Sequence, residues 1–389
     1  MKATIKVVLQ MITHAGLPPA GWGELRVIPI FKDGDGLDVV RYRPITLIVV
    51  LAKAVEAVIK SIAEEGQDGG GKKLHPSVMG FVKGKGGHLA IFNLVETVLF
   101  RQFETRHREP RHRRTYMLIT DEADAFDGMD RQLAEIALHE MGLRGKWWIL
   151  ESNMTARQQV RVDVNGTLSE PYNRTGGAAQ GAVLTPTKYS AVKSYLQERL
   201  EHWNMGVKVG DTCIVGVSYA DDGATLEESE LGMNRVLAEF EKESRDIGNR
   251  YRQKDQRILV FGPYRPKGKD WKMGNINIEE TKQVTFLGRK IATNKIQGTR
   301  TQLREVALRA GRAAVMLKWA GCCEENQSLS LLGLLFESLV ESVVIAGATT
   351  IQLAEEGRRG TCTTKYDILR PVQAKGSGEA PRQRPCWQK

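Results

Sequence analysis

The stretch VSYADDGATL, residues 217–226, places two adjacent aspartates, Asp221 and Asp222, between two apolar runs. The runs are typical of β-strands, and Asp-Asp-Gly suits the turn of a hairpin, because aspartate tolerates unusual backbone angles and glycine supplies a positive φ. Neighbouring carboxylates also repel each other, which a bound cation would relieve. On this stretch alone, both a plain turn and a cation-binding turn remain open.

A third carboxylate changes that balance. The apolar segment TYMLITD, residues 115–121, predicts a short strand that ends at Asp121. Magnesium prefers oxygen ligands and takes few carboxylates from a protein, which leaves positions for water and substrate phosphates. A two-metal phosphoryl-transfer site needs such carboxylates on adjacent strands, with the ions about 3.5–4 Å apart. Asp121 with the Asp221–Asp222 pair would meet this need, and the cations would offset the repulsion.

The composition indicates an ordinary globular protein. The chain has 389 residues, of which 41% are hydrophobic and 26% charged, enough for about two or three subdomains. Its net charge of +10 indicates a polyanionic partner, nucleic acid rather than a membrane surface. Its five cysteines lack the spacing of a zinc site or of a secreted disulfide framework.

The expected location is therefore intracellular. The sequence shows no signal peptide and no membrane span, because the apolar segment near residue 340 is interrupted by Glu337 and Glu341. We expect the nucleus for a eukaryotic source and the cytoplasm for a bacterial one, with no membrane partner. The protein partners are not indicated by any motif.

Hydrophobic periodicity divides the chain into strands and helices. Residues 25–47 alternate around the turn Asp33–Gly36, which predicts a hairpin; a calcium loop fails because its glycine and distal glutamate are not at the required spacing. Residues 158–173 predict a second hairpin at Asn165–Gly166. Helical spacing follows in four segments: 51–65, 80–100 after a glycine-rich turn, 127–153 and 180–200. This order predicts an α+β fold with helices on one face of a sheet.

Two regions are notable for their polar composition. The run TRHREPRHRR, residues 105–114, is strongly basic and forms either a solvated loop or a contact with phosphates. A helical pattern continues beyond residue 294 to about Gly347. From Arg359 onward, proline, glycine and basic residues predict a disordered tail.

Several segments resemble the motifs of one enzyme family. In chain order, TDEADAFDGMD (120–130), GGAAQGAVLTP (176–186), YADD (219–222) and VTFLG (284–288) resemble the palm motifs of reverse transcriptases, most closely those of non-LTR (LINE-like) retrotransposons. Residues 27–47 and GFVKGKGG (80–87) resemble the finger motifs of that group. The similarity covers about residues 20–290.

The resemblance implies an α+β, right-hand polymerase. Fingers and a palm, an antiparallel sheet backed by helices, would occupy residues 1–292, a helical thumb-like region residues 293–358, and the basic tail residues 359–389. We find no endonuclease, RNase H or zinc-knuckle motif, so the chain resembles the polymerase portion of a longer element protein or a truncated copy.

The same resemblance implies an RNA-directed DNA polymerase from a retrotransposon. Its partners would be an RNA template, a DNA primer or target, and dNTPs. Asp121, Asp221 and Asp222 would be the catalytic residues and the ligands of two Mg²⁺ ions, for which Mn²⁺ is a possible substitute. One ion would lower the pKa of the primer 3′-hydroxyl, and the other would hold the triphosphate and stabilise the pyrophosphate leaving group.

Three further residues would bind the nucleotide. Phe126 occupies the place of an aromatic steric gate under the sugar, although a core phenylalanine is the alternative. Gln180 would contact the nucleotide and template region, and a surface glutamine at a helix start is its alternative. Lys254 is the candidate for a general acid, although the segment around it, residues 250–260, matches the family poorly.

Cations and an apolar turn complete the predicted site. Lys32 and Arg43 would reach the triphosphate from the hairpin, because a guanidinium can bind phosphate in bidentate fashion, with Arg41 a rival for Arg43. The residues Phe286, Leu287 and Gly288 resemble the primer-grip turn.

Two other functions remain open. An RNA-dependent RNA polymerase shares the palm geometry but would not favour a bulky ring at Phe126. A non-catalytic RNA-binding relic would keep the basic surface without turnover. The presence of all three aspartates argues against a decayed copy.

Overall fold

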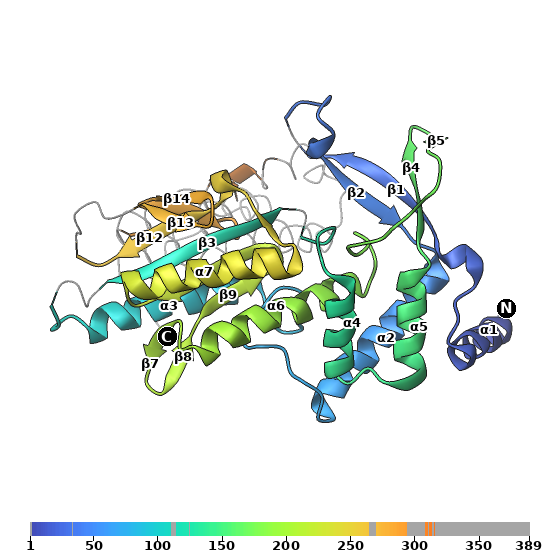
Figure 1. Cartoon of the computed structure of the whole chain (residues 1–389), viewed down its shortest axis with the longest axis horizontal. Coiled ribbons are helices and arrows are strands. Elements are labelled where there is room, and N and C mark those ends of the chain that lie inside the picture. Colours follow the sequence, from blue (N-terminus) through green and yellow to red (C-terminus); the bar gives the residue numbers. More distant parts are fainter. Residues whose placement is uncertain are drawn as a thin grey trace, which may run out of the picture. The chain divides into compact units, whose positions relative to one another are not determined.

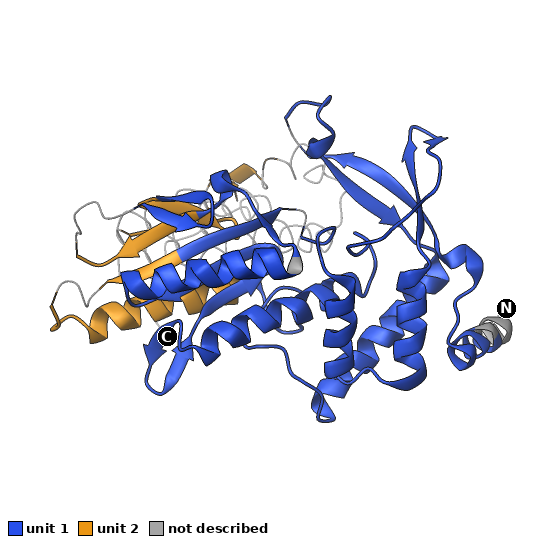
Figure 2. Ribbon diagram, in the orientation of Figure 1, with its two compact units in different colours: residues 1–86, 118–256, 267–279 blue, residues 87–117, 257–266, 280–389 orange. Residues whose placement is uncertain are grey.

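The computed structural model describes residues 2–32, 34–109, 114–123, 125–263 and 270–293, and positions 308, 309, 311, 312 and 315. The chain divides into two compact units, drawn in two colours in Figure 2. The first contains residues 1–86, 118–256 and 267–279, and the second contains residues 87–117, 257–266 and 280–389. Apart from the few positions named, the predicted thumb-like region and tail lie outside the described residues.

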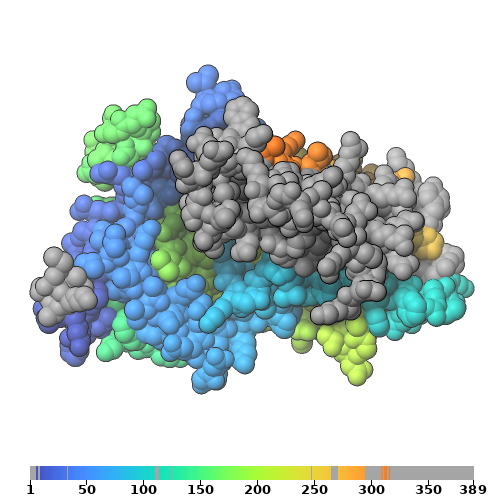
Figure 3. All heavy atoms as spheres, turned by 180° about the vertical axis from the view of Figure 1, so that it is seen from behind, coloured from blue at the N-terminus to red at the C-terminus, as the bar shows by residue number. Residues whose placement is uncertain are grey.

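A small sheet in the first unit is built on one hairpin. Strands β1 (Glu24–Phe31) and β2 (Tyr42–Leu47) pair antiparallel, which confirms the predicted hairpin. The short helix η2 (Val39–Arg41) lies in their connection, so the strands are not joined by a tight turn at the glycines. The tip of this hairpin projects from the surface (Figure 3, blue, top), and Leu37 there is 92% exposed.

The second predicted hairpin joins the same sheet. Strand β4 (Gln159–Val164) pairs with β5 (Thr167–Leu168) and β6 (Tyr172–Asn173). Its loop residues Asn165 and Gly166 both have positive φ, as the favoured two-residue hairpin turn requires. Strand β4 also pairs with β1 in parallel, a contact between distant segments that the sequence did not predict.

Helices of the first unit share one apolar core. These are α1 (Lys2–Ala15), α2 (Val50–Asp68), α4 (Arg131–Glu140), α5 (Gly145–Ala156) and α6 (Thr185–His202), shown in Figure 1. The helical spacing over 127–153 is therefore two helices, because Gly142 turns the chain at φ +110° and its backbone packs on that of Gly66. Val58 is 46% exposed although it is apolar, since the buried residues of α2 follow the narrower stripe Ala52, Val55, Ile59 and Ala63.

The larger sheet carries the candidate site. In the first unit, the order is β11 (Arg250–Tyr251), β3 (Thr115–Ala123, from Leu118 on), β10 (Asp222–Glu227) and β9 (Gly216–Tyr219). Helix α7 (Glu230–Ile247) packs on β10 and on β13 (Trp271–Met273), which pairs with β14 (Ile276–Glu280). A separate hairpin joins β7 (Val207–Val209) to β8 (Thr212–Ile214).

The described part of the second unit includes a helix, the start of β3 and three further strands. Helix α3 (Gly87–Glu104) confirms the helix predicted after the glycine-rich turn. Strand β12 (Arg257–Phe261) is joined to the hairpin β15 (Gln283–Phe286) and β16 (Arg289–Ala292) through a hydrogen bond from Thr281 N to Ile258 O, 2.8 Å long. None of the helices in the described ranges has the length and apolar character needed to cross a membrane.

Candidate active site

The two adjacent aspartates lie on a constrained hairpin turn. Strands β9 and β10 pair from Thr225↔Gly216 to Asp222↔Tyr219, so Ala220 and Asp221 form a two-residue loop and Asp222 begins β10. Ala220 has φ +55°, a conformation that costs an L-residue about 1–2 kcal/mol. The strained turn thus presents both carboxylates from a short, well-paired hairpin.

The glycine after the aspartates has another role than predicted. Positive φ was expected at Gly223, but within this turn it occurs at Ala220, and Gly223 lies in β10. A Cβ at Gly223 would lie 2.3 Å from Thr120 Oγ1 on β3. Glycine is therefore required for close approach of the two strands rather than for the turn.

This close approach brings Asp121 to the same site. Glu122 N on β3 donates to Asp221 O at 3.1 Å. The Gln256 side chain fixes the backbone of Asp121, since its Nε2 donates to Asp121 O at 2.9 Å and its Oε1 accepts from Asp121 N at 3.4 Å. Gln256 was not predicted, although it stands two residues after Lys254 in the sequence.

The three aspartates are close enough to interact electrostatically. Burial raises the pKa of Asp121 to about 6, with further repulsion from Asp221 and Asp255. Burial also raises the pKa of Asp222 to about 7, with repulsion from Asp221 and Asp121. Both effects make the ionised form of each carboxyl unfavourable, because negative charge is buried and repelled there. A bound cation would offset that unfavourable charge.

The donor set fits a hard divalent ion by its chemistry. All three groups offer carboxylate oxygens, which Mg²⁺ prefers, and the set leaves room for substrate phosphates. Across the described ranges, however, no three or more His, Cys, Asp or Glu side chains already stand in metal-binding geometry. The aspartates therefore meet the requirement of residue type, but the described side chains are not arranged as a preformed metal site.

Phe126 lies in the loop between β3 and α4, five residues after Asp121 in the sequence. Its ring packs edge-to-face on Tyr189 with 5.3 Å between centroids, and its centroid is 6.3 Å from that of Phe81. The ring contacts an apolar cluster that includes Met129 and Ala178, yet it is only partly buried. One side is thus held by the core and the remainder is accessible, which both the gate and the core interpretation allow.

Gln180 lies in a loop held against the hairpin. Its carbonyl oxygen accepts from Thr46 N on β2 at 2.7 Å. The following residue, Gly181, has φ +114°, and a Cβ there would lie 2.7 Å from Thr46 O. The loop is therefore locked to β2 by backbone contacts, and the Gln180 side chain is half-buried.

The predicted cations of the hairpin are exposed. Lys32 follows β1, and Arg43 lies in β2 opposite Ile30. Arg41 forms an ion pair with Asp38 (Nε to Oδ2, 3.5 Å), and Arg43 is the more exposed of the two arginines. Both arginines therefore remain candidates for binding the phosphates.

Two further predictions concern the segment after α7 and the β15–β16 turn. Lys254 is exposed in the short helix η4 (Gln253–Asp255), whose neighbours Arg252 and Asp255 influence the pKa of Asp121. The residues Phe286, Leu287 and Gly288 form the turn between β15 and β16, where Leu287 and Gly288 have positive φ. This turn belongs to the second unit, whereas all the other predicted site residues belong to the first.

Comparison with known proteins gives the family. Residues 31–291 match the family described as "Reverse transcriptase (RNA-dependent DNA polymerase)", which is more than half of the chain. The chain belongs to the reverse transcriptase family. The predicted family resemblance is thereby confirmed.

Similar proteins agree with this assignment. The reverse transcriptase is 26% identical over 234 residues to the "Retrovirus-related Pol polyprotein from type-1 retrotransposable element R2" of Popillia japonica, a match that covers 59% of this chain and 31% of the relative. The chain thus spans about a third of the length of that relative. This relative comes from a non-LTR retrotransposon, the group that the sequence motifs resemble most closely.

Solved structures show the fold alone, because their identities are low. Telomerase of Candida tropicalis in complex with the TWJ fragment of telomeric RNA has a TM-score of 0.51 at 9% identity, covering 95% of this chain and 66% of that one. Apo telomerase of the same organism, truncated from its C-terminal domain, has a TM-score of 0.50 at 11% identity, covering 75% and 59%. The reverse transcriptase has the predicted α+β, right-hand polymerase fold.

A buried polar network lies behind the aspartates of the reverse transcriptase. Glu122 accepts from the Tyr189 hydroxyl at 2.5 Å and bonds Lys193, which also donates to Glu243 at 3.2 Å. The Tyr251 hydroxyl lies 3.1 Å from Glu122 Oε1 and 2.8 Å from Glu243 Oε2, so its single proton is shared between the two carboxylates. Burial by itself lowers the pKa of Lys193, but the two carboxylates overcome it and hold that pKa above its usual range. The network joins β3, α6, α7 and β11; the only sequence signal was a glutamate at the end of an apolar strand.

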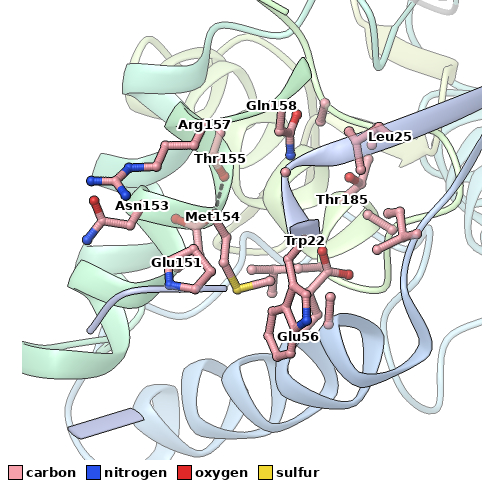
Figure 4. A pocket seen from close by; sticks show the side chains of 18 of the residues that line it. Trp22, Leu25, Glu56, Glu151, Asn153, Met154, Thr155, Arg157, Gln158 and Thr185 are labelled. Atoms are coloured by element: carbon pink, nitrogen blue, oxygen red, sulfur yellow. Dashed lines mark hydrogen bonds between the residues drawn. The ribbon is translucent and has the colours of Figure 1, made fainter. Parts of the chain in front are cut away.

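A pocket in the first unit is separate from the predicted site. Figure 4 shows Trp22 and Glu56 on one side of it and Glu151 and Thr155 on another, and none of the predicted site residues lines it. Glu151 pairs with Lys188 and accepts from Thr155 Oγ1 at 2.8 Å. Burial raises the pKa of Glu56, whose Oε2 accepts from Val183 N at 2.6 Å. This pocket is a partly polar cavity of the core that lies beside the loop 177–182.

Proposed function

We propose that this reverse transcriptase extends a DNA primer along an RNA template with dNTPs, by nucleotidyl transfer at two Mg²⁺ ions. The observation that carries the proposal is the convergence of Asp121 with the hairpin turn Asp221–Asp222, where burial and the neighbouring carboxylates raise the pKa of Asp121 and of Asp222. Mn²⁺ is a possible substitute, since it accepts the same oxygen ligands. The likeness to the R2 element protein supports a retrotransposon origin.

The three aspartates would hold the ions, which supply activation of the primer 3′-hydroxyl and neutralisation of the triphosphate when bound. Gln256 keeps the Asp121 backbone in place beside Asp221. Lys32 and Arg43 would hold the triphosphate from the hairpin, because the phosphates need cations. Phe126 would exclude the 2′-hydroxyl, and Gln180 would contact the nucleotide from its locked loop.

Four further assignments complete the proposal. Lys254 would donate a proton to the leaving group, and Phe286, Leu287 and Gly288 would position the primer end. Fingers and palm would lie within residues 1–292, with the thumb and tail beyond. The protein would act inside the cell, in the nucleus of a eukaryote or the cytoplasm of a bacterium, wherever its RNA template and DNA target meet.

The test is primer extension on an RNA template with dNTPs or NTPs supplied separately. We expect extension with dNTPs only, loss of extension with EDTA, and recovery with Mg²⁺. Extension with NTPs instead would identify an RNA-dependent RNA polymerase. Binding of RNA without extension by either nucleotide set would identify the non-catalytic relic.

A further inference from the structure

Two loops of the first unit carry residues proposed to select the nucleotide. One follows β3 and contains Phe126 and Asp127, and the other runs from Arg174 to Gln180. They meet backbone to backbone, since Ala178 N donates to Phe126 O at 2.7 Å. Gly177 has φ +65°, and a Cβ there would lie 2.4 Å from Asp127 O. The two loops therefore touch at a point where no side chain fits.

Arg174 ties the two loops together across this contact. Its side chain is only 12% exposed. Its Nη2 donates to Asp127 Oδ1 at 2.7 Å and to Ala178 O at 2.6 Å, and its Nε donates to Gly176 O at 3.2 Å. One guanidinium thus holds a carboxylate of the first loop and two carbonyls of the second.

Arg131 makes a second set of bonds from the start of α4. Its Nε donates to Gly177 O at 2.8 Å, and its Nη1 donates to Arg174 O at 2.8 Å and Thr155 O at 3.2 Å. Its Nη2 donates to Gln158 Oε1 at 3.3 Å. Arg131 therefore anchors the second loop to the end of α5 and to the helix that follows the first loop.

Both positions need the shape of arginine as well as its charge. A guanidinium has five N–H donors in a rigid fork, whereas a lysine ammonium is a compact point charge that cannot span these carbonyls. Burial lowers the pKa of Arg131, and the nearby Arg174 cation lowers it further. Arg131 and Arg174 are both partly buried and repel each other, so their hydrogen bonds must outweigh this repulsion.

We propose that Arg131 and Arg174 are positioning residues for sugar selection, which fix the Phe126 loop against the loop that carries Gln180. The proposal rests on the polymerase function above and on the gate role of Phe126. A shift of the gate by about 1 Å changes rates on the order of a hundredfold. Loosening the two loops therefore admits a 2′-hydroxyl, while the aspartates, held on β3 and the β9–β10 turn, keep their places.

The test compares Arg131→Lys and Arg174→Lys with wild type in primer extension. The quantity measured is the ratio of kcat/KM for dGTP over rGTP, because that ratio defines discrimination. We expect it to fall about tenfold or more in each variant, with a higher KM for dGTP and a kcat changed less than about threefold. Arg199→Lys is the matched control, since Arg199 on α6 pairs with Glu239 at 2.8 Å instead, and its ratio should stay at the wild-type value.

A second, milder variant guards against misfolding. Asp127→Asn removes one charged acceptor of Arg174 at a solvent-exposed position, so the fold should persist, and a smaller fall of the ratio is expected. A purely structural role would lower kcat/KM for both nucleotides equally and leave every ratio unchanged, which overturns the proposal.

The Phe126→Ala variant distinguishes a failure of the positioning role from a failure of the proposed polymerase function. If that variant loses discrimination while the arginine and Asp127 variants keep it, the positioning role alone is wrong. If Phe126→Ala keeps discrimination, the gate and the positioning role are both wrong, although polymerisation stands. Absence of extension by wild type would remove the proposed function itself.

Discussion

Single residues carry most of what the sequence could show about the site. Asp121, Asp221 and Asp222 were recognisable because aspartates at strand ends stand out against apolar neighbours. Gln256 and Lys193 were not recognisable, because each acts on partners that are far away in the sequence. Gln256 bonds the backbone of Asp121, and Lys193 bonds Glu122 and Glu243. A residue type becomes informative only when its partners are known.

Asp221→Asn should reduce primer extension by more than about a hundredfold, since the amide cannot neutralise the cations that stabilise the transition state. Asp221 is exposed, so its melting temperature and its affinity for nucleic acid should stay near those of wild type. Asp211→Asn, in the exposed β7–β8 turn, is the control. A near-wild-type rate for Asp221→Asn would refute the metal-ligand assignment.

Glu227 gives a pH-dependent prediction. Burial raises the pKa of this carboxyl on β10 from 4.5 to about 7, although Gly206 N and Glu228 N donate to it. The folded state therefore binds more protons than the unfolded state between these values. The stabilisation that this group gives at low pH is lost as the pH rises to about 7.

We therefore expect the free energy of unfolding of Glu227→Gln, relative to wild type, to increase between about pH 5 and pH 8. Urea unfolding of both proteins across this range measures the difference, in which all other titrating groups cancel. A difference that stays constant with pH would show that Glu227 titrates normally.

At the scale of elements, the periodicity of the sequence predicted those hairpins and helices that form through interactions between residues close in the sequence. Both hairpins and the helices α2, α3 and α6 were predicted from alternation and helical spacing. The parallel pairing of β1 with β4 was not, because register between distant strands depends on how the whole unit packs. The break between α4 and α5 was missed for a similar reason, since Gly142 is required by its contact with Gly66 on α2.

Gly80 provides a test at this scale. A Cβ at Gly80 would lie 2.3 Å from Ala220 N, in the hairpin turn that carries Asp221. We expect Gly80→Ala to lower the free energy of unfolding by about 1–3 kcal/mol and to slow extension, because backbone must move. Gly21→Ala, with no atom within 4 Å of its Cβ, is the control. Equal stabilities and extension rates in the two variants would show that the hairpin turn can shift without a free-energy cost, and would contradict the prediction.

For the molecule as a whole, the net charge of +10 predicts a nucleic-acid partner, which fits the reverse transcriptase family, but it does not say which surface binds that partner. Affinity for template-primer should fall with salt, with a slope in log K against log salt of about −0.7 to −0.9 for each phosphate neutralised. Arg111→Gln with Arg113→Gln should reduce the slope by about 1.4–1.8 if both contact phosphates. Filter binding at several salt concentrations measures it, and an unchanged slope would make the basic run a solvated loop.

The division into two units also has a genetic consequence. The chain passes from one unit to the other after residues 86, 117, 256, 266 and 279, so neither unit is encoded by one uninterrupted stretch of the gene. A recombination crossover between two such genes would exchange parts of both units at once, and new combinations would survive mainly between close homologues. A premature stop codon between residues 257 and 280 would likewise leave the second unit without its β15–β16 hairpin while the first keeps its aspartates.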